Sequence, residues 1–294
     1  MDTVALRTFV EVCRIGSISG AAAALGYSQS AVSRQVAVLE REVGHPLVER
    51  LPRGVRTTVH GEAFLGHARV AVRELERAVE AARDATTTRR RRVNLGAVPS
   101  ATASLVPRAM TRLARTDPDV TVSLTGDLTP RLLDRLVAEE LDLVVVTDYP
   151  PGLPDLPGVR FRHLLDEEVH LVVGAGHRRL ARTTRRRVRW ETLDDESWVE
   201  DNAGSAAVLH LAAARAGFVP RVEYDVRGLL SKLALVASGH GIALVPGLMV
   251  PGLRPDVVVR RLADPPTRGV YAGYRHATAE NESLLAALDA EVTG

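Results

Sequence analysis

The sequence predicts an α+β protein with several domains, and three observations support this. The chain has 294 residues, whereas one domain usually takes roughly 100 to 200 residues. Apolar residues recur at helical spacing through about residue 90. Beyond residue 92, apolar runs typical of buried strands alternate with segments of helical pattern, and this alternation is typical of an α/β domain.

Composition narrows the function classes. Hydrophobic residues make up 46% and charged residues 25% of the chain, the balance of an ordinary globular protein. No apolar run approaches the ~18 residues of a membrane span, and the N-terminus lacks the layout of an export signal. We therefore expect a cytoplasmic protein with no membrane partner. The single cysteine, Cys13, excludes intrachain disulfides, redox pairs and cysteine zinc clusters.

The net charge of +2 conceals an uneven distribution. Residues 1–92 hold 15 arginines against 10 acidic residues, whereas the rest of the chain holds 23 basic against 26 acidic residues. A basic first third favours contact with a polyanion such as nucleic acid. A chance excess is the alternative, because a surplus of this size on such a segment is common.

Three helices are predicted before residue 45. The first covers residues 4–13 and ends at Gly16, and the second is capped by Ser17 or Ser19. Ser28 caps the third, whose apolar residues share one buried stripe: Val32, Val36, Leu39 and Val43.

A second face of the third helix is small, polar and free of acidic residues. It is formed by Gln29, Ser30, Ser33, Arg34 and Ala37. Small side chains allow close approach to the DNA major groove, where Gln, Ser and Arg can donate to base edges or phosphates. An ordinary solvent-exposed face is the alternative for this helix taken alone.

The segment PLVERLPRGVRTTVHG, which follows the third helix, favours DNA binding. It predicts two short extended arms around residues 52–54, with Arg50, Arg53 and Arg56 at or near the tip. A basic β-wing beside a helix-turn-helix contacts phosphates and the minor groove. The sequence therefore predicts a winged helix-turn-helix.

A long helix capped by Thr58 is predicted from about residue 61 to about residue 90. Its apolar residues recur every three or four positions, as in a heptad seam: Phe64, Ala68, Ala71, Leu75, Ala78 and Ala82. We expect this seam to pair two copies of the chain in a homodimer. Packing within its own domain is the alternative.

The arginine-rich stretch 86–94 marks the start of a further region. The interleaved elements predict α/β folding with a largely parallel sheet, in one domain or in two lobes. The Gly- and Pro-rich stretch 148–158 would serve as a crossing between lobes. Strands are predicted at 93–98, 120–125, 141–147, 169–174, 241–246 and 257–262, and helices near 104–116, 129–140, 205–216 and 228–238.

Three strand-to-helix junctions in this region offer hydroxyl or amide side chains to a ligand. Unpaired N–H groups and the helix dipole favour anions at such helix starts, so a small organic carboxylate is the expected ligand. Simple helix capping is the alternative at each junction. The candidate residues are Ser100, Thr102, Thr129, Asn202 and Ser205.

Other chemistry is not predicted. The sequence has no HExxH, GxSxG, Walker or GxGxxG motif, which argues against an enzyme, and we expect no cofactor. A cluster at 163–170 contains His163 and His170, but a strand would point alternate residues to opposite faces, so no metal is expected. A solute-binding transport protein would require an export signal.

The N-terminal residues resemble the LysR-type transcriptional regulators. The resemblance is carried by SQ-x-A-x-S-R-Q at 28–35, LE-x-E-x-G at 39–44 and PL-x-x-R at 46–50. It is sharp over residues 1–65 and only architectural over the rest of the chain.

The resemblance implies three domains: a winged helix-turn-helix at 1–60, a dimerising linker helix at 61–91 and an effector-binding domain at 92–294. The last is expected to have two α/β lobes, like a type 2 periplasmic binding protein, with a small organic effector between them. The implied partners are a double-stranded DNA operator with dyad symmetry, further copies of the chain in a homotetramer, and RNA polymerase.

The resemblance also assigns individual DNA contacts. Gln29, Ser30, Ser33 and Arg34 correspond to the recognition-helix contacts, which are the residues that helical geometry selects independently. Arg53 corresponds to the wing contact. For Arg50, a DNA contact and a structural role both remain open.

Overall fold

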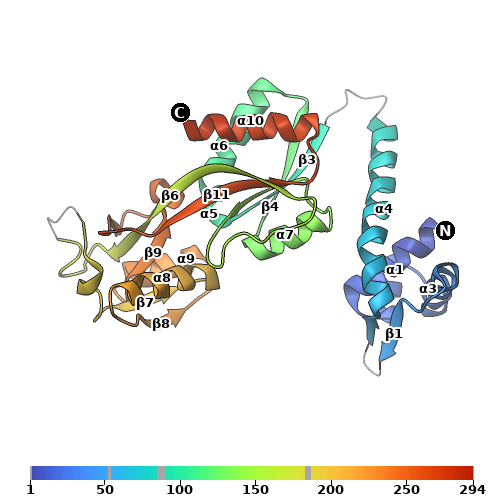
Figure 1. Cartoon of the computed structure of the whole chain (residues 1–294), viewed down its shortest axis with the longest axis horizontal. Coiled ribbons are helices and arrows are strands. Elements are labelled where there is room, and N and C mark those ends of the chain that lie inside the picture. The colour runs from blue at the N-terminus through green and yellow to red at the C-terminus, as the bar shows by residue number, and fades with distance from the viewer. Residues whose placement is uncertain (1, 52–53, 85–90, 183–186, 294) are drawn as a thin grey trace. The chain divides into compact units, whose positions relative to one another are not determined.

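The computed structural model describes residues 2–51, 54–84, 91–182 and 187–293. The chain forms two compact units, residues 1–90 and residues 91–294 (Figure 1). Among the described residues, no helix is long and apolar enough to cross a membrane.

The first unit begins with three short helices, α1 (Thr3–Ile15), α2 (Ile18–Leu25) and α3 (Gln29–Val43). Each helix is capped at its start by a side-chain oxygen that accepts a backbone N–H. The capping residues are Asp2, Ser17 and Ser28 respectively. Each helix ends at a glycine in the left-handed conformation, which costs glycine little because it has no Cβ. Ser17, rather than Ser19, is therefore the cap of α2.

A two-stranded antiparallel wing follows, formed by β1 (Val48–Leu51) and β2 (Gly54–Thr57). The Val55 N–H donates to the Gly16 carbonyl at 2.8 Å, so the wing is attached to the turn between α1 and α2. Gly54 has a φ of 103°, and a Cβ there would lie 2.5 Å from the Gly16 oxygen. The close approach of the wing therefore requires glycine at this position.

Helix α4 (Val59–Asp84) leaves the wing. Thr58 fixes its start, because the hydroxyl accepts from the Gly61 N–H at 2.9 Å and donates to the Pro46 carbonyl at 2.7 Å. A Cβ on Gly61 would lie 1.9 Å from the Leu47 oxygen, so the first turn of α4 passes directly against the main chain before the wing.

The second unit is built on a seven-stranded sheet in the order β10-β6-β11-β5-β3-β4, with β9 also paired to β6. β3 pairs in parallel with β4 and β5, whereas β11 and β6 run antiparallel to their neighbours. The prediction of a largely parallel sheet is therefore wrong: the sheet is mixed. The strands are β3 (Arg91–Ala97), β4 (Val120–Gly126), β5 (Leu143–Thr147), β6 (Arg160–Gly174), β9 (Ala243–Pro246), β10 (Val257–Arg260) and β11 (Thr267–Tyr274).

β6 joins the two lobes of this unit. Its first half pairs with β11 and its second half pairs with β9 and β10, and Figure 1 shows it running from one lobe into the other. A separate parallel pair, β7 (Ser197–Glu200) and β8 (Arg221–Asp225), belongs to the second lobe.

Each lobe has its own apolar core, and helices cover its strands. In the first lobe, α6 and α10 pack together, while α8 and α9 belong to the second. The helices are α5 (Pro99–Ala103), α6 (Leu105–Thr116), α7 (Thr129–Val137), α8 (Ala203–Arg215), α9 (Leu229–Ala237) and α10 (Ala279–Thr293), with 3-10 turns η1 (Trp190–Thr192) and η2 (Gly247–Gly252).

Candidate DNA-contact face and effector site

The outer face of α3 carries the residues that the sequence predicts for DNA contact. Gln29, Ser30 and Arg34 are exposed, and Ser33 is half-buried, because the apolar stripe of the same helix is buried in the core. Arg34 forms no ion pair with any residue that the structure describes. Its guanidinium is therefore available to a base edge or a phosphate.

Two neighbouring polar residues of α3 have structural roles that the sequence does not reveal. Gln35 Oε1 accepts a hydrogen bond from the buried Thr8 hydroxyl at 2.5 Å, which holds α3 against α1. Glu40 Oε1 accepts from the backbone N–H groups of Leu47 and Val48 at 2.8 and 3.1 Å. The glutamate therefore ties the end of α3 to the start of the wing.

The wing arginines differ in availability. Arg56 forms an ion pair with Glu49, directly opposite on β1, at 2.8 Å. Arg50 is exposed and forms no ion pair within the described part of the chain, so its guanidinium can reach a phosphate. Arg53 lies outside the described residues.

The predicted seam on α4 divides into two parts. Phe64 and Ala68 pack into the core of their own unit, which matches the alternative for these two positions. Ala71, Leu75 and Ala78 are exposed. Ala82 belongs to α4, but its side chain lies outside the described residues.

The surroundings of Cys13 are not those of a reactive thiol. It packs against the core of the first unit, and burial raises the pKa of the thiol to about 11. A thiol needs a lowered pKa to react readily at neutral pH. Among the described residues, no group of three or more His, Cys, Asp or Glu side chains could hold a metal ion.

In the second unit, Ser100 lies at the start of α5 and is buried. Its Oγ accepts a hydrogen bond from Arg268 Nη2 at 2.5 Å. Arg268 also pairs with Glu167 at 2.6 Å, and these two residues face each other directly across the β6–β11 pair. The Ser100 hydroxyl, which the sequence predicts as an effector contact, is therefore already bonded to the Arg268 guanidinium.

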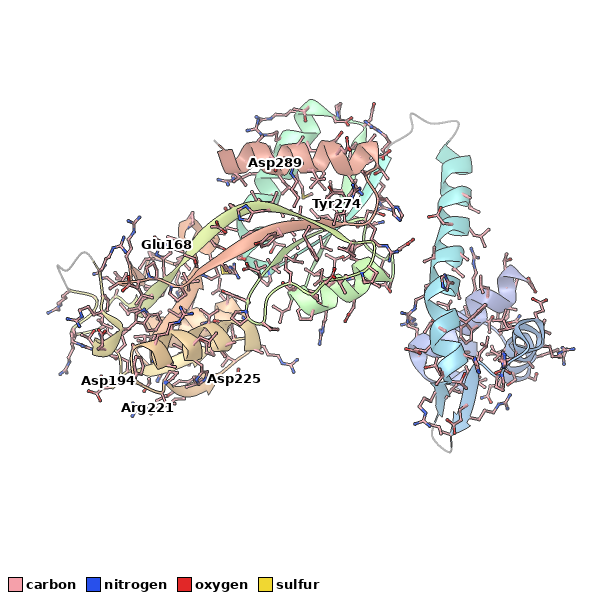
Figure 2. The ribbon with its side chains drawn as sticks, in the orientation of Figure 1. Glu168, Asp194, Arg221, Asp225, Tyr274 and Asp289 are labelled. Atoms are coloured by element: carbon pink, nitrogen blue, oxygen red, sulfur yellow. The ribbon has the colours of Figure 1, made fainter. Side chains whose placement is uncertain are left out.

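This ion pair also contacts η2, where the Leu248 side chain packs against the core of the first lobe. Glu167 Oε2 accepts from the Leu248 N–H of η2 at 2.7 Å, while Arg268 reaches Ser100 on α5. Figure 2 labels Glu168, the next residue of β6, after which β6 leaves β11 and pairs with β9. A continuous chain of polar contacts thus runs from α5 across the crossing strands to η2.

Tyr149 joins this chain to the start of α8. The Arg268 guanidinium carbon lies 4.4 Å from the centre of the Tyr149 ring, a cation–π contact. A Cβ on Gly204 would lie 2.9 Å from the same ring, so α8 begins against it. Burial raises the pKa of Tyr149 to about 12, against the opposing effect of Arg268.

Asn202 and Ser205 gather at the start of α8 around a buried lysine. Asn202 Oδ1 caps the helix by accepting the Ser205 N–H at 2.9 Å. The Ser205 hydroxyl is 3.2 Å from Lys232 Nζ, and Lys232 also contacts Glu200 at 2.9 Å and Asp201 at 3.2 Å. The other Glu200 oxygen, Oε1, is buried without a hydrogen-bond partner among the described atoms.

The two threonine candidates are bonded locally. The Thr129 hydroxyl bonds to the main-chain oxygen and N–H of Thr147 at 3.3 and 3.2 Å. The Thr102 hydroxyl donates to the Pro99 carbonyl at 2.8 Å. The structure thus brings Ser100 to the Arg268 pair and Ser205 to Lys232. Asn202 bonds to Asp201 and to the Ser205 N–H, and both threonines bond to nearby main chain.

Sequence reasoning missed Arg268, Glu167, Tyr149 and Lys232 at this site. The one available signal was that Lys232 is the only lysine of the chain. The other three come from strands or loops far apart in the sequence, and the contacts between them are visible only in the fold.

Comparison with known proteins supports both halves of this description. Residues 4–62 match the model of the bacterial regulatory helix-turn-helix protein, lysR family, and residues 86–290 match the LysR substrate binding domain. The HTH-type transcriptional regulator TfdS of Cupriavidus pinatubonensis is 31% identical over 268 residues, which cover 90% of this chain and 88% of TfdS. PcaQ of Agrobacterium fabrum is 35% identical over 172 residues, 58% of this chain and 55% of PcaQ.

Solved structures show the same fold. Full-length CbnR complexed with its target DNA has a TM-score of 0.70 at 22% identity, covering 100% of this chain and 99% of that one. A mutant of Corynebacterium glutamicum OxyR has a TM-score of 0.62 at 23% identity, covering 99% and 92%.

The fold and the two matched domains define a DNA-binding transcription regulator with an effector-binding domain. The chain belongs to the LysR family of transcriptional regulators. Its relatives are regulators, and it is a regulator rather than an enzyme.

Proposed function

We propose that this regulator reads its operator with the α3 face formed by Gln29, Ser30, Ser33 and Arg34, and that Arg50 and Arg53 of the wing contact the backbone. The observation that carries the proposal is the free Arg34 guanidinium on a helix face without acidic residues. Arginine commonly contacts guanine in the major groove through two hydrogen bonds.

The test is fluorescence anisotropy with DNA from upstream of the chain's own gene. Arg34→Ala should weaken binding by about 1–3 kcal/mol and relax the sequence preference. Arg115→Ala, which removes an exposed arginine of α6 in the other unit, is the matched control and should leave the affinity unchanged. Wild-type affinity for Arg34→Ala would refute the assigned face.

The proposal includes a homodimer that pairs through Ala71, Leu75 and Ala78 of α4. These residues are exposed and small or apolar, which suits closely approaching helices. A dimer would present two α3 helices to an operator with dyad symmetry. Two such dimers would form the homotetramer. The regulator would act in the cytoplasm, where binding to promoter DNA would bring it close to RNA polymerase.

We further propose that the effector binds between the lobes, where Ser100 meets Arg268 and where Ser205, next to the capping residue Asn202, meets Lys232. The contacts among Arg268, Tyr149 and the start of α8 support this position, because they cross from one lobe to the other. A ligand that touches both lobes can shift their arrangement only by its difference in affinity for the two states.

The structure supports a carboxylate effector less than the sequence does, because the helix starts offer fewer free N–H groups than expected. Asn202 already accepts the Ser205 N–H at the start of α8, and α5 is only five residues long. Thr102 and Thr129 could still contribute hydroxyl oxygens as acceptors from a ligand, since each hydroxyl keeps a free lone pair.

A further inference from the structure

The charges around the start of α8 are unbalanced. Lys232 is 1% exposed and Glu200 is 2% exposed. The single Lys232 ammonium serves two carboxylates, since it contacts both Glu200 and Asp201. One Glu200 oxygen, Oε1, has no hydrogen-bond partner within the described residues. A buried carboxylate oxygen without a donor is unfavourable, and a donor supplied from outside the chain would satisfy it.

The charged residues at the β6–β11 pair do not correct this imbalance. The Arg268 guanidinium is already paired with Glu167. Within the described part of the chain, the Asp148 carboxylate is bonded to neutral donors only, the Gly269 N–H at 2.7 Å and the Tyr271 hydroxyl at 3.4 Å. The residues named here thus comprise four carboxylates and two cations, Arg268 and Lys232.

Tyr149 is the common neighbour of these groups. Besides Arg268, the carboxylates of Glu167, Glu200 and Asp201 act on its phenol, and all three raise its pKa. The Tyr149 phenol thus lies within the influence of three carboxylates and one guanidinium.

We propose that the effector carries a protonated amine, which donates a hydrogen bond to Glu200 Oε1 and is also attracted by Asp201. This inference rests on the proposed function, because it assumes that the effector binds between the lobes. An ammonium supplies both a positive charge and directed N–H donors, and charge-assisted hydrogen bonds of this kind are the strong ones.

Two other ligand classes fit less well. A divalent metal ion would need several oxygen ligands, but Glu200 Oε2 already binds Lys232 at 2.9 Å, so Glu200 would offer the ion a single oxygen. A ligand with only a carboxylate would add a fifth negative charge to the region. An ammonium corrects the imbalance without displacing Lys232.

The experiment uses the full chain labelled with [15N]lysine. Because Lys232 is the only lysine, its Nζ gives a single NMR signal at the site. The probes are matched triplets of small molecules. Each triplet comprises a primary amine, its N-acetyl derivative, and a carboxylate with the same carbon skeleton and no amine. The readouts are the Lys232 Nζ shift and the thermal stability, since binding to the folded state raises apparent stability.

We expect amines to move the Nζ signal and raise the melting temperature, and N-acetyl derivatives and carboxylates to do neither. Glu200→Gln should reduce amine affinity by at least about tenfold, the loss of one charged hydrogen bond. Asp201→Asn is a second variant at a more exposed position and should reduce amine affinity in the same direction. Glu196→Gln, which alters a carboxylate bonded to Arg179 and His177, is the matched control and should not.

Two outcomes would overturn the inference in distinguishable ways. If carboxylates or N-acetyl derivatives bind while amines do not, the effector lies between the lobes but is not an amine. If no probe of any charge moves the Lys232 signal or the melting temperature, effector binding at this place fails, and the inference fails with it. Amine binding that is unchanged in both Glu200→Gln and Asp201→Asn would also contradict it.

Discussion

Arg268 and Glu167 face each other across the β6–β11 pair, buried at 6% and 7% exposure, where the sheet passes between the lobes. Arg268 also donates to Ser100 of α5, and Glu167 accepts from the Leu248 N–H of η2. Tyr149 stacks on Arg268 and packs against the core of the second lobe, so this contact links the pair to that lobe. The pair is the natural element through which an effector would act on lobe geometry.

Replacing Arg268 with Leu should destabilise the second unit by about 3–5 kcal/mol, because Glu167 would be left buried without its cation. Both tryptophans, Trp190 and Trp198, lie in this unit, so denaturant unfolding followed by tryptophan fluorescence reports on it alone. Arg115→Leu is the exposed control. A shift no larger than that of the control would mean that the ion pair is not needed for stability.

Arg50→Ala should weaken binding to operator and unrelated DNA alike, because a phosphate contact carries no sequence information. It should also lower the salt slope of the binding constant by about one. Arg56→Ala is the matched control, since Arg56 is already paired with Glu49, and should have a smaller effect. Equal effects of the two variants, measured by anisotropy across a salt series, would contradict the assignment.

Leu75→Glu should dissociate the dimer, because pairing through α4 would bring two buried carboxylates together. Light scattering measures the mass directly. Leu230→Glu, at an 80% exposed position of α9, introduces the same charge elsewhere and should leave the mass unchanged. An unaltered mass for Leu75→Glu would exclude this stretch of α4 as the dimer seam.

Cys13 should alkylate slowly in the folded protein. Its pKa is raised to about 11 by burial, so the thiolate that reacts is rare near neutral pH. The rate with iodoacetamide should rise about tenfold per pH unit between pH 8 and pH 10, as expected for a group still far from its pKa. In urea, the rate at pH 8 should be more than about a hundredfold higher, because an ordinary thiol has a pKa of about 8.5. Equal rates in buffer and urea would show that burial does not protect this thiol.

The first unit could be predicted closely because its signals are local. Serine caps, terminal glycines and the apolar period each act within a few residues, and they place α1, α2, α3 and the wing. The motif around Glu40 was visible in the sequence, but its bonds to Leu47 and Val48 depend on the folded turn.

The second unit was harder for physical reasons. The pattern predicts β3, β4, β5, β9 and β10, which are apolar runs, but neither β11 nor the first half of β6. Charged residues such as Glu167 and Arg268 are normally exposed. Here both are buried, because each is paired with the other across a separation of 101 residues. The effector candidates Thr102 and Thr129 could not be told from local capping for the same reason, since only the fold identifies their partners.

The central claim is that α3 of a paired regulator reads a specific operator. Hydroxyl-radical footprinting on DNA from upstream of the chain's own gene tests it most directly, with the wild type and Arg34→Ala compared at equal occupancy. The account predicts two protected stretches related by a dyad, about one helical turn or a multiple of it apart, and loss of this pattern in Arg34→Ala. Uniform protection without a preferred site, or the same two stretches in both proteins, would contradict it.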